Sequence, residues 1–286
     1  MAEAIELPDG RQVPYAECGD PLGVPLLYLH GAPGSRLEAN PDSPFAADLA
    51  NAGVRCIGMD RPGYGLSLPL ANRDLYAQAA DVEAFADQLG LDRFLVVGWS
   101  FGGPVALAAG ARLPDRIVGV GTIASIAPID GAGLEGMGER SFLELARRDP
   151  DELRAQMKDL AASMRQDPAT ASLSMIGPLL NDADIEFTLR PEVNPFMMAD
   201  LAESARADYA GYADDCIAQV ADWGFDLTDV SVPVRLAHGT DDRIIPIRHS
   251  RYLADVLPKA SFTEHQGDGH ISVLCHLVGL CEQIKA

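Results

Sequence analysis

The sequence predicts an α/β fold: a mostly parallel central sheet flanked by helices, with a helical cap inserted after the sixth strand. Two observations support this prediction. Short apolar runs alternate with amphipathic segments along most of the chain, and strands that alternate with helices form parallel sheets. Between residues 128 and 222 the alternation stops, and only helical signals remain.

Six strands are expected before residue 128. The first two, at 3–7 and 11–17, flank the turn-forming sequence Pro8-Asp9-Gly10, which is typical of paired strands. The other four are short apolar runs, the usual pattern of buried strands, and they lie at residues 25–30, 55–60, 94–98 and 116–123.

Helices are expected between these strands. Over residues 72–89 the apolar side chains recur at helical spacing, and Gly90 supplies a stop signal. A second helix is predicted to open around Phe101, directly after the fifth strand. This order of elements favours parallel strands joined by helical crossovers.

The segment 128–222 is predicted to form the helical cap. Asp149-Pro150 and Asp167-Pro168 each combine a capping carboxylate with a proline at the first helical position. Six of the eight Met residues fall in this segment. Their unbranched side chains indicate an adaptable apolar surface rather than a rigid core.

The alternation resumes after the cap with two strands and two helices, expected at residues 234–238, 246–257, 260–265 and from 271 onward. We therefore predict one core domain, made of residues 1–127 and 223–286, and one cap, made of residues 128–222.

The charge balance excludes several partners. The chain has 22 Lys plus Arg against 42 Asp plus Glu, a formal net charge of -20 over 286 residues. A surface this acidic is repelled by phosphate backbones and anionic membranes, so we expect neither nucleic acid nor a membrane as partner. The N-terminus lacks a signal-peptide pattern and no apolar run of about 18 residues occurs, so a cytoplasmic location is expected.

No cofactor or metal site is predicted. The five Cys residues have no zinc or redox spacing and are expected to be buried free thiols. His265, Asp268 and His270 could be imagined as metal ligands, but they lack a second carboxylate or a Cys partner. The glycines around Asp268 are not followed by a phosphate-binding pattern, so no dinucleotide is expected.

The strongest local signal is Gly98-Trp99-Ser100-Phe101-Gly102, where a strand meets a helix. This G-x-S-x-G pattern is typical of a nucleophile elbow, a strained turn that lifts the serine hydroxyl above the sheet. The residues two before and two after the serine must be small, because strand and helix approach closely there. A serine hydroxyl becomes a useful nucleophile when a His, oriented by a carboxylate, takes its proton.

A carboxylate and a His are available downstream in that order. Asp241 and Asp242 follow the strand at 234–238, and His270 follows the strand at 260–265. The carboxyl ends of parallel strands share one edge of the sheet, so these side chains are expected to meet Ser100.

Five ordered segments resemble the α/β-hydrolase superfamily, namely His30-Gly31-Ala32-Pro33-Gly34-Ser35, Asp60-Arg61-Pro62-Gly63-Tyr64-Gly65-Leu66-Ser67, the elbow, His238-Gly239 through Asp242 to Pro246, and Gly267-Asp268-Gly269-His270. The resemblance is to serine hydrolases with a helical lid, such as esterases and prolyl-aminopeptidase relatives. It implies Ser100 as nucleophile, His270 as general base and then acid, and Asp242 as the orienting carboxylate. The family's Gly-x-x-Asp-x-x-x-Pro register selects Asp242 rather than Asp241.

The same resemblance places the oxyanion hole at the backbone amides of Ala32 and Phe101. Other polar residues of these segments are expected to hold loops by hydrogen bonds, namely His30, His238, Asp60 and Arg61. Trp99 is expected to pack beside the elbow.

The expected function is a serine hydrolase that cleaves carboxylic esters of small to medium apolar substrates through an acyl-enzyme on Ser100. The alternatives with the same triad are a lactonase, a C–C bond hydrolase or an aminopeptidase. A non-catalytic ligand-binding protein of this fold is a further alternative. The partner is thus a small ester-like molecule, and the sequence leaves the oligomeric state open.

Overall fold

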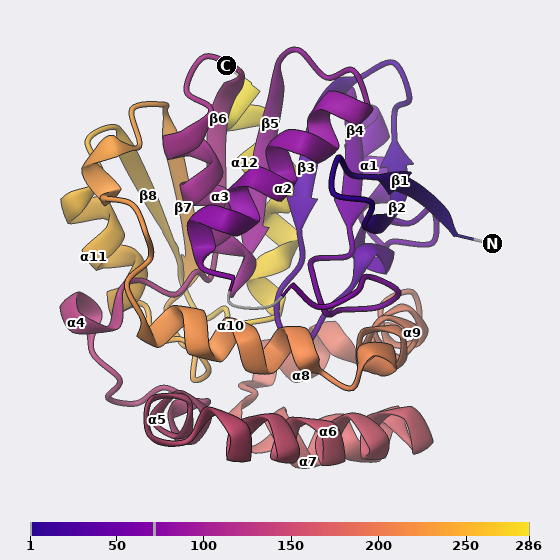
Figure 1. Cartoon of the computed structure of the whole chain (residues 1–286), viewed down its shortest axis with the longest axis vertical. Helices are drawn as coiled ribbons and strands as arrows, with labels where there is room; N and C mark the ends of the chain where they lie inside the picture. The colour runs from indigo at the N-terminus through magenta and orange to yellow at the C-terminus, as the bar shows by residue number, and fades with distance from the viewer. Residues whose placement is uncertain (1, 71–72, 286) are drawn as a thin grey trace.

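The computed structural model describes residues 2–70 and 73–285, and it has one eight-stranded sheet covered by helices (Figure 1). The strand order is β1-β2-β4-β3-β5-β6-β7-β8. The strands are β1 (Glu3–Glu6), β2 (Gln12–Gly19), β3 (Val24–Leu29), β4 (Val54–Met59), β5 (Phe94–Trp99), β6 (Ile117–Ile123), β7 (Val234–Gly239) and β8 (Ala260–His265).

The sheet is mostly parallel, as predicted. Only β2 runs antiparallel to its neighbours, pairing with β1 on one side and β4 on the other. From β4 to β8 every pairing is parallel, with Leu27 opposite Ile57 and Val96. The carboxyl ends of β3, β5, β7 and β8 therefore point to the same edge.

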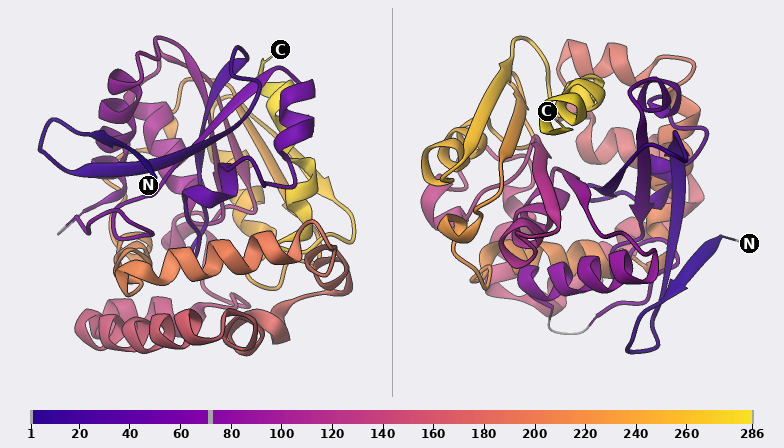
Figure 2. Two further views of the ribbon diagram at one scale, coloured as in Figure 1. Left: turned by 90° about the vertical axis from the view of Figure 1, so that its right-hand side faces the viewer. Right: turned by 90° about the horizontal axis from the view of Figure 1, so that it is seen from above.

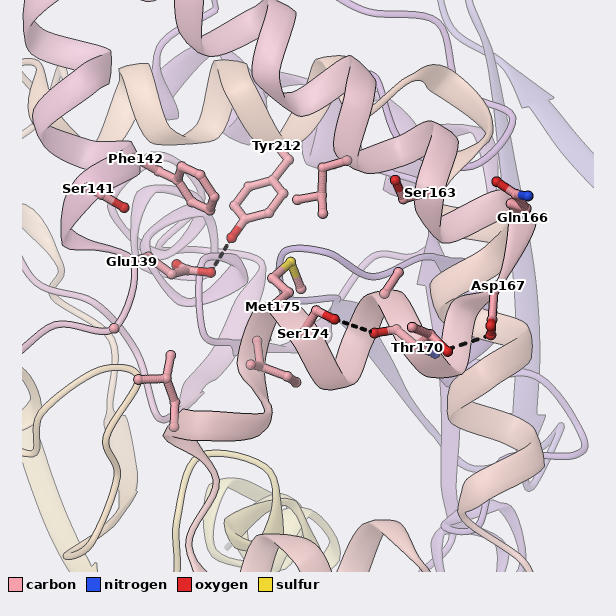
Figure 3. A pocket seen from close by; sticks show the side chains of 15 residues that line it. Glu139, Ser141, Phe142, Ser163, Gln166, Asp167, Thr170, Ser174, Met175 and Tyr212 are labelled. Atoms are coloured by element: carbon pink, nitrogen blue, oxygen red, sulfur yellow. Dashed lines mark hydrogen bonds between the residues drawn. The ribbon is translucent and has the colours of Figure 1, made fainter.

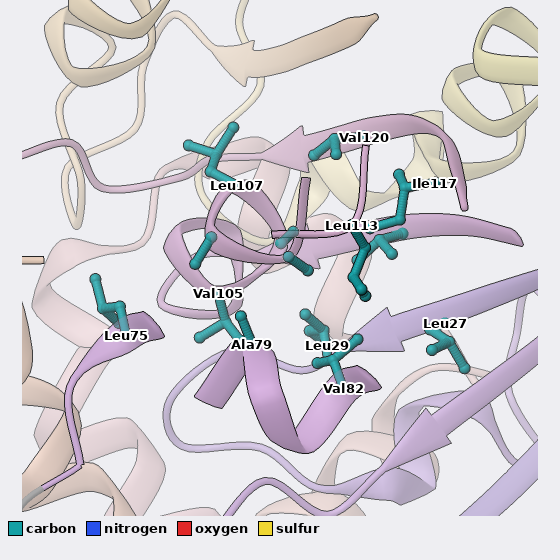
Figure 4. Close-up of a cluster of buried hydrophobic side chains, with 14 of the residues drawn as sticks. Leu27, Leu29, Leu75, Ala79, Val82, Val105, Leu107, Leu113, Ile117 and Val120 are labelled. Atoms are coloured by element: carbon teal, nitrogen blue, oxygen red, sulfur yellow. The ribbon is translucent and has the colours of Figure 1, made fainter. Parts of the chain in front are cut away.

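Helices cover both faces of the sheet (Figures 1 and 2). α2 (Leu75–Gln88), α3 (Gly102–Arg112) and α11 (Arg248–Val256) pack on one face, and α1 (Ala46–Asn51) and α12 (Leu277–Lys285) on the other. Each face carries a hydrophobic cluster; we call the one under α2, α3 and α11 the first cluster and the one under α1 and α12 the second cluster. Because side chains alternate across a strand, Leu27 and Leu29 belong to the first cluster and Leu26 belongs to the second. Figure 4 shows part of the first cluster, in which α2 and α3 meet the strands.

Seven α-helices lie between β6 and β7, and we call this segment the cap. They are α4 (Ile129–Ala132), α5 (Arg140–Arg148), α6 (Pro150–Gln166), α7 (Pro168–Ile176), α8 (Asp182–Thr188), α9 (Asn194–Ser204) and α10 (Ala210–Val220). In Figure 1, α10 lies between the sheet and the outer helices α6 and α7. The predicted fold class, with helices inserted after the sixth strand, is confirmed, whereas the exact domain boundaries stay a prediction.

Short 3-10 helices occur at Arg36–Ala39 (η1), Gly177–Leu179 (η2), Ala205–Ala207 (η3), Leu227–Asp229 (η4) and Ser272–His276 (η5). Two of the predicted helix starts have the expected caps. The side chain of Asp149 accepts from the amide of Glu152, and that of Asp167 from the amide of Thr170, each at 3.1 Å.

Two expectations about sulfur-containing residues need correction. Met137, Met157 and Met164 are buried in the cap's own hydrophobic cluster rather than on an adaptable surface, because α5, α6 and α10 turn their apolar faces toward one another. Four Cys residues are buried free thiols, but Cys275 is exposed. Among the described residues, no helix is long and apolar enough to cross a membrane.

Candidate active site

Ser100 lies at the turn between β5 and α3, at the carboxyl edge of the sheet. Its φ of 54° is in the left-handed region, which is strained for a residue with a side chain. The amide of Ser100 donates to the carbonyl of Ile123 on the neighbouring strand at 2.9 Å. The turn is thus held in the strained form that a nucleophile elbow requires.

The glycines around Ser100 are required by close approach. A Cβ at Gly98 would overlap the carbonyl oxygen of Gly102, and a Cβ at Gly102 would overlap that of Leu29. A Cβ at Gly103 would overlap the hydroxyl of Ser125. The packing between strand and helix therefore requires small residues at positions 98 and 102, as the sequence pattern predicts.

The three predicted triad side chains meet at this edge. Nε2 of His270 lies 3.1 Å from Oγ of Ser100, and Nδ1 of His270 lies 2.7 Å from Oδ2 of Asp242. All three side chains are buried. One imidazole therefore bridges a hydroxyl and a carboxylate, which is the arrangement that lets a His take the serine proton.

Asp242 is held by more than His270. Its Oδ1 accepts from the amides of Ile244 and Ile245 at 2.8 and 2.9 Å, and its Oδ2 lies 3.1 Å from Nε2 of His238. Burial alone would raise the pKa of Asp242, but attraction to His270 and hydrogen bonds from both histidines outweigh it and lower that pKa. The carboxylate is therefore ionised at neutral pH.

His238 thus does more than brace its loop. Its Nε2 also lies 2.8 Å from the carbonyl of Ile245, and its Nδ1 lies 2.7 Å from Oγ of Ser250. Because Nε2 faces two acceptors, the proton belongs on Nε2, and Nδ1 accepts from the serine hydroxyl.

The loop after β3 carries the amide of Ala32, and Arg61 fixes its orientation. The guanidinium of Arg61 donates to the carbonyls of His30 and Gly31 at 3.1 and 3.0 Å. Because a trans peptide directs its C=O and the next N–H to opposite sides, the amide of Ala32 faces away from Arg61. Neither that amide nor the one of Phe101 has an acceptor among the described residues, so both are available to a ligand.

Asp184, on α8 of the cap, positions the His270 loop. Its carboxylate accepts from the amides of Ile271 and Ser272 at 2.9 and 2.8 Å, and from that of His270 at 3.3 Å. Gly269 leaves the room that this carboxylate occupies. Sequence reasoning missed Asp184, because only the fold brings residue 184 beside residue 270.

Glu139 is a second residue that sequence reasoning missed. It precedes α5, is buried, and accepts a hydrogen bond from the hydroxyl of Tyr212 on α10. Burial raises the pKa of Glu139 to about 7, although the bond from Tyr212 and the nearby His270 act in the opposite direction. Its single sequence signal is an acidic residue at a helix start, which is common.

Two cavities adjoin at Glu139. The cavity at the nucleophile is about 50 Å³ and is lined by Ser100, His270 and Trp99, with apolar side chains from the cap and the loops. A larger cavity of about 610 Å³ lies within the cap (Figure 3). Both are lined by Glu139, Met175 and Ile176, so these three residues form a shared wall.

Comparisons with known proteins show which proteins the chain resembles. The chain is 27% identical over 276 residues to a non-heme chloroperoxidase of Streptomyces lividans, covering 94% of this chain and 92% of the relative. It is 29% identical over 263 residues to a 2-hydroxymuconate semialdehyde hydrolase of Pseudomonas putida, covering 89% and 83%. The crystal structure of an enol-lactonase from Burkholderia xenovorans LB400 superposes with a TM-score of 0.69 at 21% identity, covering 99% and 98%.

A family profile also matches most of the chain. The profile of the alpha/beta hydrolase fold matches residues 24–276, which include the whole cap and all the predicted site residues. The relatives of this chain are enzymes that catalyse different reactions, so the match identifies the fold family and not the substrate. The chain belongs to the α/β-hydrolase family.

Proposed function

We propose that this protein is a serine hydrolase that cleaves carboxylic esters through an acyl-enzyme formed on Ser100. The observation that carries the proposal is the His270 imidazole, which lies within hydrogen-bond distance of both Ser100 and Asp242. An orienting carboxylate, a base and a nucleophile in contact supply the proton transfers that acyl transfer needs.

In the first half-reaction, Oγ of Ser100 attacks the ester carbonyl carbon and its proton moves to Nε2 of His270. The Asp242 carboxylate holds the proton on Nδ1 and stabilises the imidazolium. The amides of Ala32 and Phe101 donate to the oxyanion of the tetrahedral intermediate. When the intermediate collapses, the leaving alcohol takes the proton from Nε2, and the acyl group stays on Ser100.

In the second half-reaction, His270 takes a proton from water, and the resulting hydroxide attacks the acyl carbon. The second tetrahedral intermediate collapses and returns the proton from His270 to Oγ of Ser100. The carboxylic acid leaves, and the enzyme is restored. Each half-reaction uses the same base and the same two amides.

An apolar acyl or alcohol group suits the cavity at Ser100. Apart from the polar triad residues and Glu139, its lining side chains are apolar, namely Ala32, Pro33, Trp99, Met175, Ile176, Met197, Leu201, Ile244 and Ile271. Desolvating an apolar group there is favourable, whereas an anionic substrate meets the acidic surface and the buried Glu139.

A substrate panel tests the proposal. p-Nitrophenyl esters, lactones and amino-acid p-nitroanilides are compared at equal concentration, with Ser100→Ala as the paired variant. We expect the esters to have the highest kcat/KM and the variant to lose nearly all of it while keeping its circular dichroism spectrum. A folded Ser100→Ala protein with full esterase activity would refute the proposal, and faster turnover of another substrate class would reassign the reaction.

A further inference from the structure

Three metal-ligating side chains meet beside the loop that carries His270. They are His265 at the end of β8, Asp268 in the loop, and His276 at the end of η5. Their ligand atoms all lie within 4.8 Å of one another. In the sequence, His270 was considered as a ligand together with His265 and Asp268. In the fold, His270 contacts Ser100 and Asp242 instead. The third side chain of the cluster is that of His276.

The spacing of the three side chains fits a small divalent ion. Nε2 of His276 lies 2.8 Å from Oδ2 of Asp268, and the rings of His265 and His276 are stacked with centroids 3.5 Å apart. Zinc binds imidazole nitrogen and carboxylate oxygen at about 2.0–2.2 Å, which separates tetrahedral ligand atoms by roughly 3.4 Å. Small rotations that open the stacked rings would bring the atoms to that separation.

The backbone under these ligands is braced before any ion arrives. The amides of Thr240 and Asp241 donate to the carbonyls of His265 and Asp268 at 2.9 and 3.0 Å. The amide of Gly267 donates to Oγ1 of Thr240 at 2.9 Å. A metal site gains affinity when its ligands need little reordering on binding.

The position of the cluster also suits exchange with solvent. All three ligand residues are partly exposed, so an ion can enter, and a coordination position stays open to water. Two imidazoles and one carboxylate favour zinc-like transition ions over magnesium or calcium, which prefer oxygen ligands.

We propose that His265, Asp268 and His276 bind one divalent transition-metal ion of the zinc class. The ion would tie the end of β8 to η5 across the loop that carries His270. Its role is to stabilise this segment, since none of its three ligands touches Ser100. The proposal does not depend on which bond the enzyme cleaves.

Metal titration tests the site directly. The full-length protein is freed of metal with a chelator and titrated with Zn²⁺ by calorimetry and with Co²⁺ by visible absorption. We expect one ion per chain, and Co²⁺ bands typical of nitrogen and oxygen ligands in a low-coordinate site. At zinc 100-fold above its Kd, Tm should rise by roughly 5 °C.

Three variants locate the binding. His276→Gln and His265→Gln should each weaken Zn²⁺ binding at least about 10-fold, with far-ultraviolet circular dichroism confirming that they fold. Cys275→Ser is the matched control, because this exposed thiol adjoins His276 and is not one of the proposed ligands. The variant should bind as the wild type does. Absence of stoichiometric binding, unchanged affinity in both His variants, or loss of binding in Cys275→Ser would each overturn the proposal.

Discussion

At the scale of single residues, Asp241 and Asp242 are adjacent in the chain but differ in surroundings. Asp242 is buried against His270 and His238. Asp241 is exposed, and its carboxylate accepts a hydrogen bond from the hydroxyl of Thr240. The residue types alone did not decide which of the two carboxylates orients His270. Adjacent residues point in different directions, and here the register of the turn after β7 decides which one reaches the base.

This difference gives a paired prediction. Asp242→Asn should lower kcat/KM by about 10⁴-fold, because an amide favours the wrong His270 tautomer and does not stabilise the imidazolium. Asp241→Asn should change kcat/KM less than about threefold. Steady-state kinetics on a p-nitrophenyl ester measure both. Equal losses in the two variants would contradict the assignment of Asp242.

Glu139 gives a prediction about pH. Its pKa rises from the ordinary 4.5 to about 7 on folding, so between these values the folded state binds more protons than the unfolded state. Stability therefore falls as pH rises through this window, by up to about 3 kcal/mol from this one group. Glu139→Gln removes this contribution to the pH dependence of stability, because the glutamine amide does not titrate.

Chemical denaturation at pH 5 and pH 8 measures the contribution of Glu139 to the pH dependence of stability. The unfolding free energy of the wild type relative to Glu139→Gln should be lower at pH 8 than at pH 5. Glu144→Gln, at an exposed position on the helix α5 that follows Glu139, should have the same stability as the wild type at both pH values. A pH-independent difference between wild type and Glu139→Gln would contradict the burial argument.

Some site residues are marked by a contiguous sequence motif, whereas others are brought to the site only by the fold. Ser100 and its flanking glycines could be predicted because the elbow is a contiguous pattern with a steric reason for each position. Asp184 and Glu139 could not, because each contacts residues more than 70 positions away in the chain. A single acidic residue or His carries no sequence signal until the fold supplies its partner.

At the scale of elements, the close contact between β5 and α3 limits what the elbow tolerates. Gly102→Ala should destabilise the protein by about 1–3 kcal/mol and lower activity, because the new Cβ meets the backbone of Leu29 and His30. Gly279→Ala on α12 is the matched control, since a Cβ there has open space. It should be neutral or stabilising by up to about 1 kcal/mol. Thermal unfolding measures the stability of both variants. Equal changes in Tm for Gly102→Ala and Gly279→Ala would contradict the close approach of backbone atoms at Gly102.

The central strands β3, β4, β5 and β6 were predictable because each is a short apolar run, and β1 and β2 because they flank a turn-forming sequence. The long helices were predictable where their caps or periodicity are complete. The helix α1 was not predicted: it has six residues, of which only Leu49 is buried, too few for a periodic pattern. The interpretation of the Met residues failed at Met137, Met157 and Met164 for a related reason. Composition does not reveal that α5, α6 and α10 bury their apolar faces against one another.

At the scale of the whole molecule, a buried ion network joins the cap to the core. Asp215 on α10 contacts Arg61 at 2.6 Å and Arg73 at 2.7 Å, with the side chains almost fully buried. The same Arg61 fixes the loop of Ala32. The position of the cap is thereby linked to the proposed oxyanion hole.

Breaking this network should be costly. Asp215→Asn leaves two buried guanidinium groups without their carboxylate and should destabilise the protein by about 3–5 kcal/mol. Its neighbour Asp214 pairs with the half-exposed Arg154 at 3.1 Å, and Asp214→Asn should cost less than about 1 kcal/mol. Denaturant unfolding compares the two, and similar losses would show that the buried network does not hold the cap.

The most direct test of the central claim, an activated nucleophile at Ser100, is labelling with a fluorophosphonate probe followed by mass spectrometry of the peptides. The proposed chemistry predicts one probe per chain, attached to Oγ of Ser100, with labelling lost in Ser100→Ala and much slower in Asp242→Asn. No labelling of the folded wild-type protein, or labelling at another residue, would contradict it.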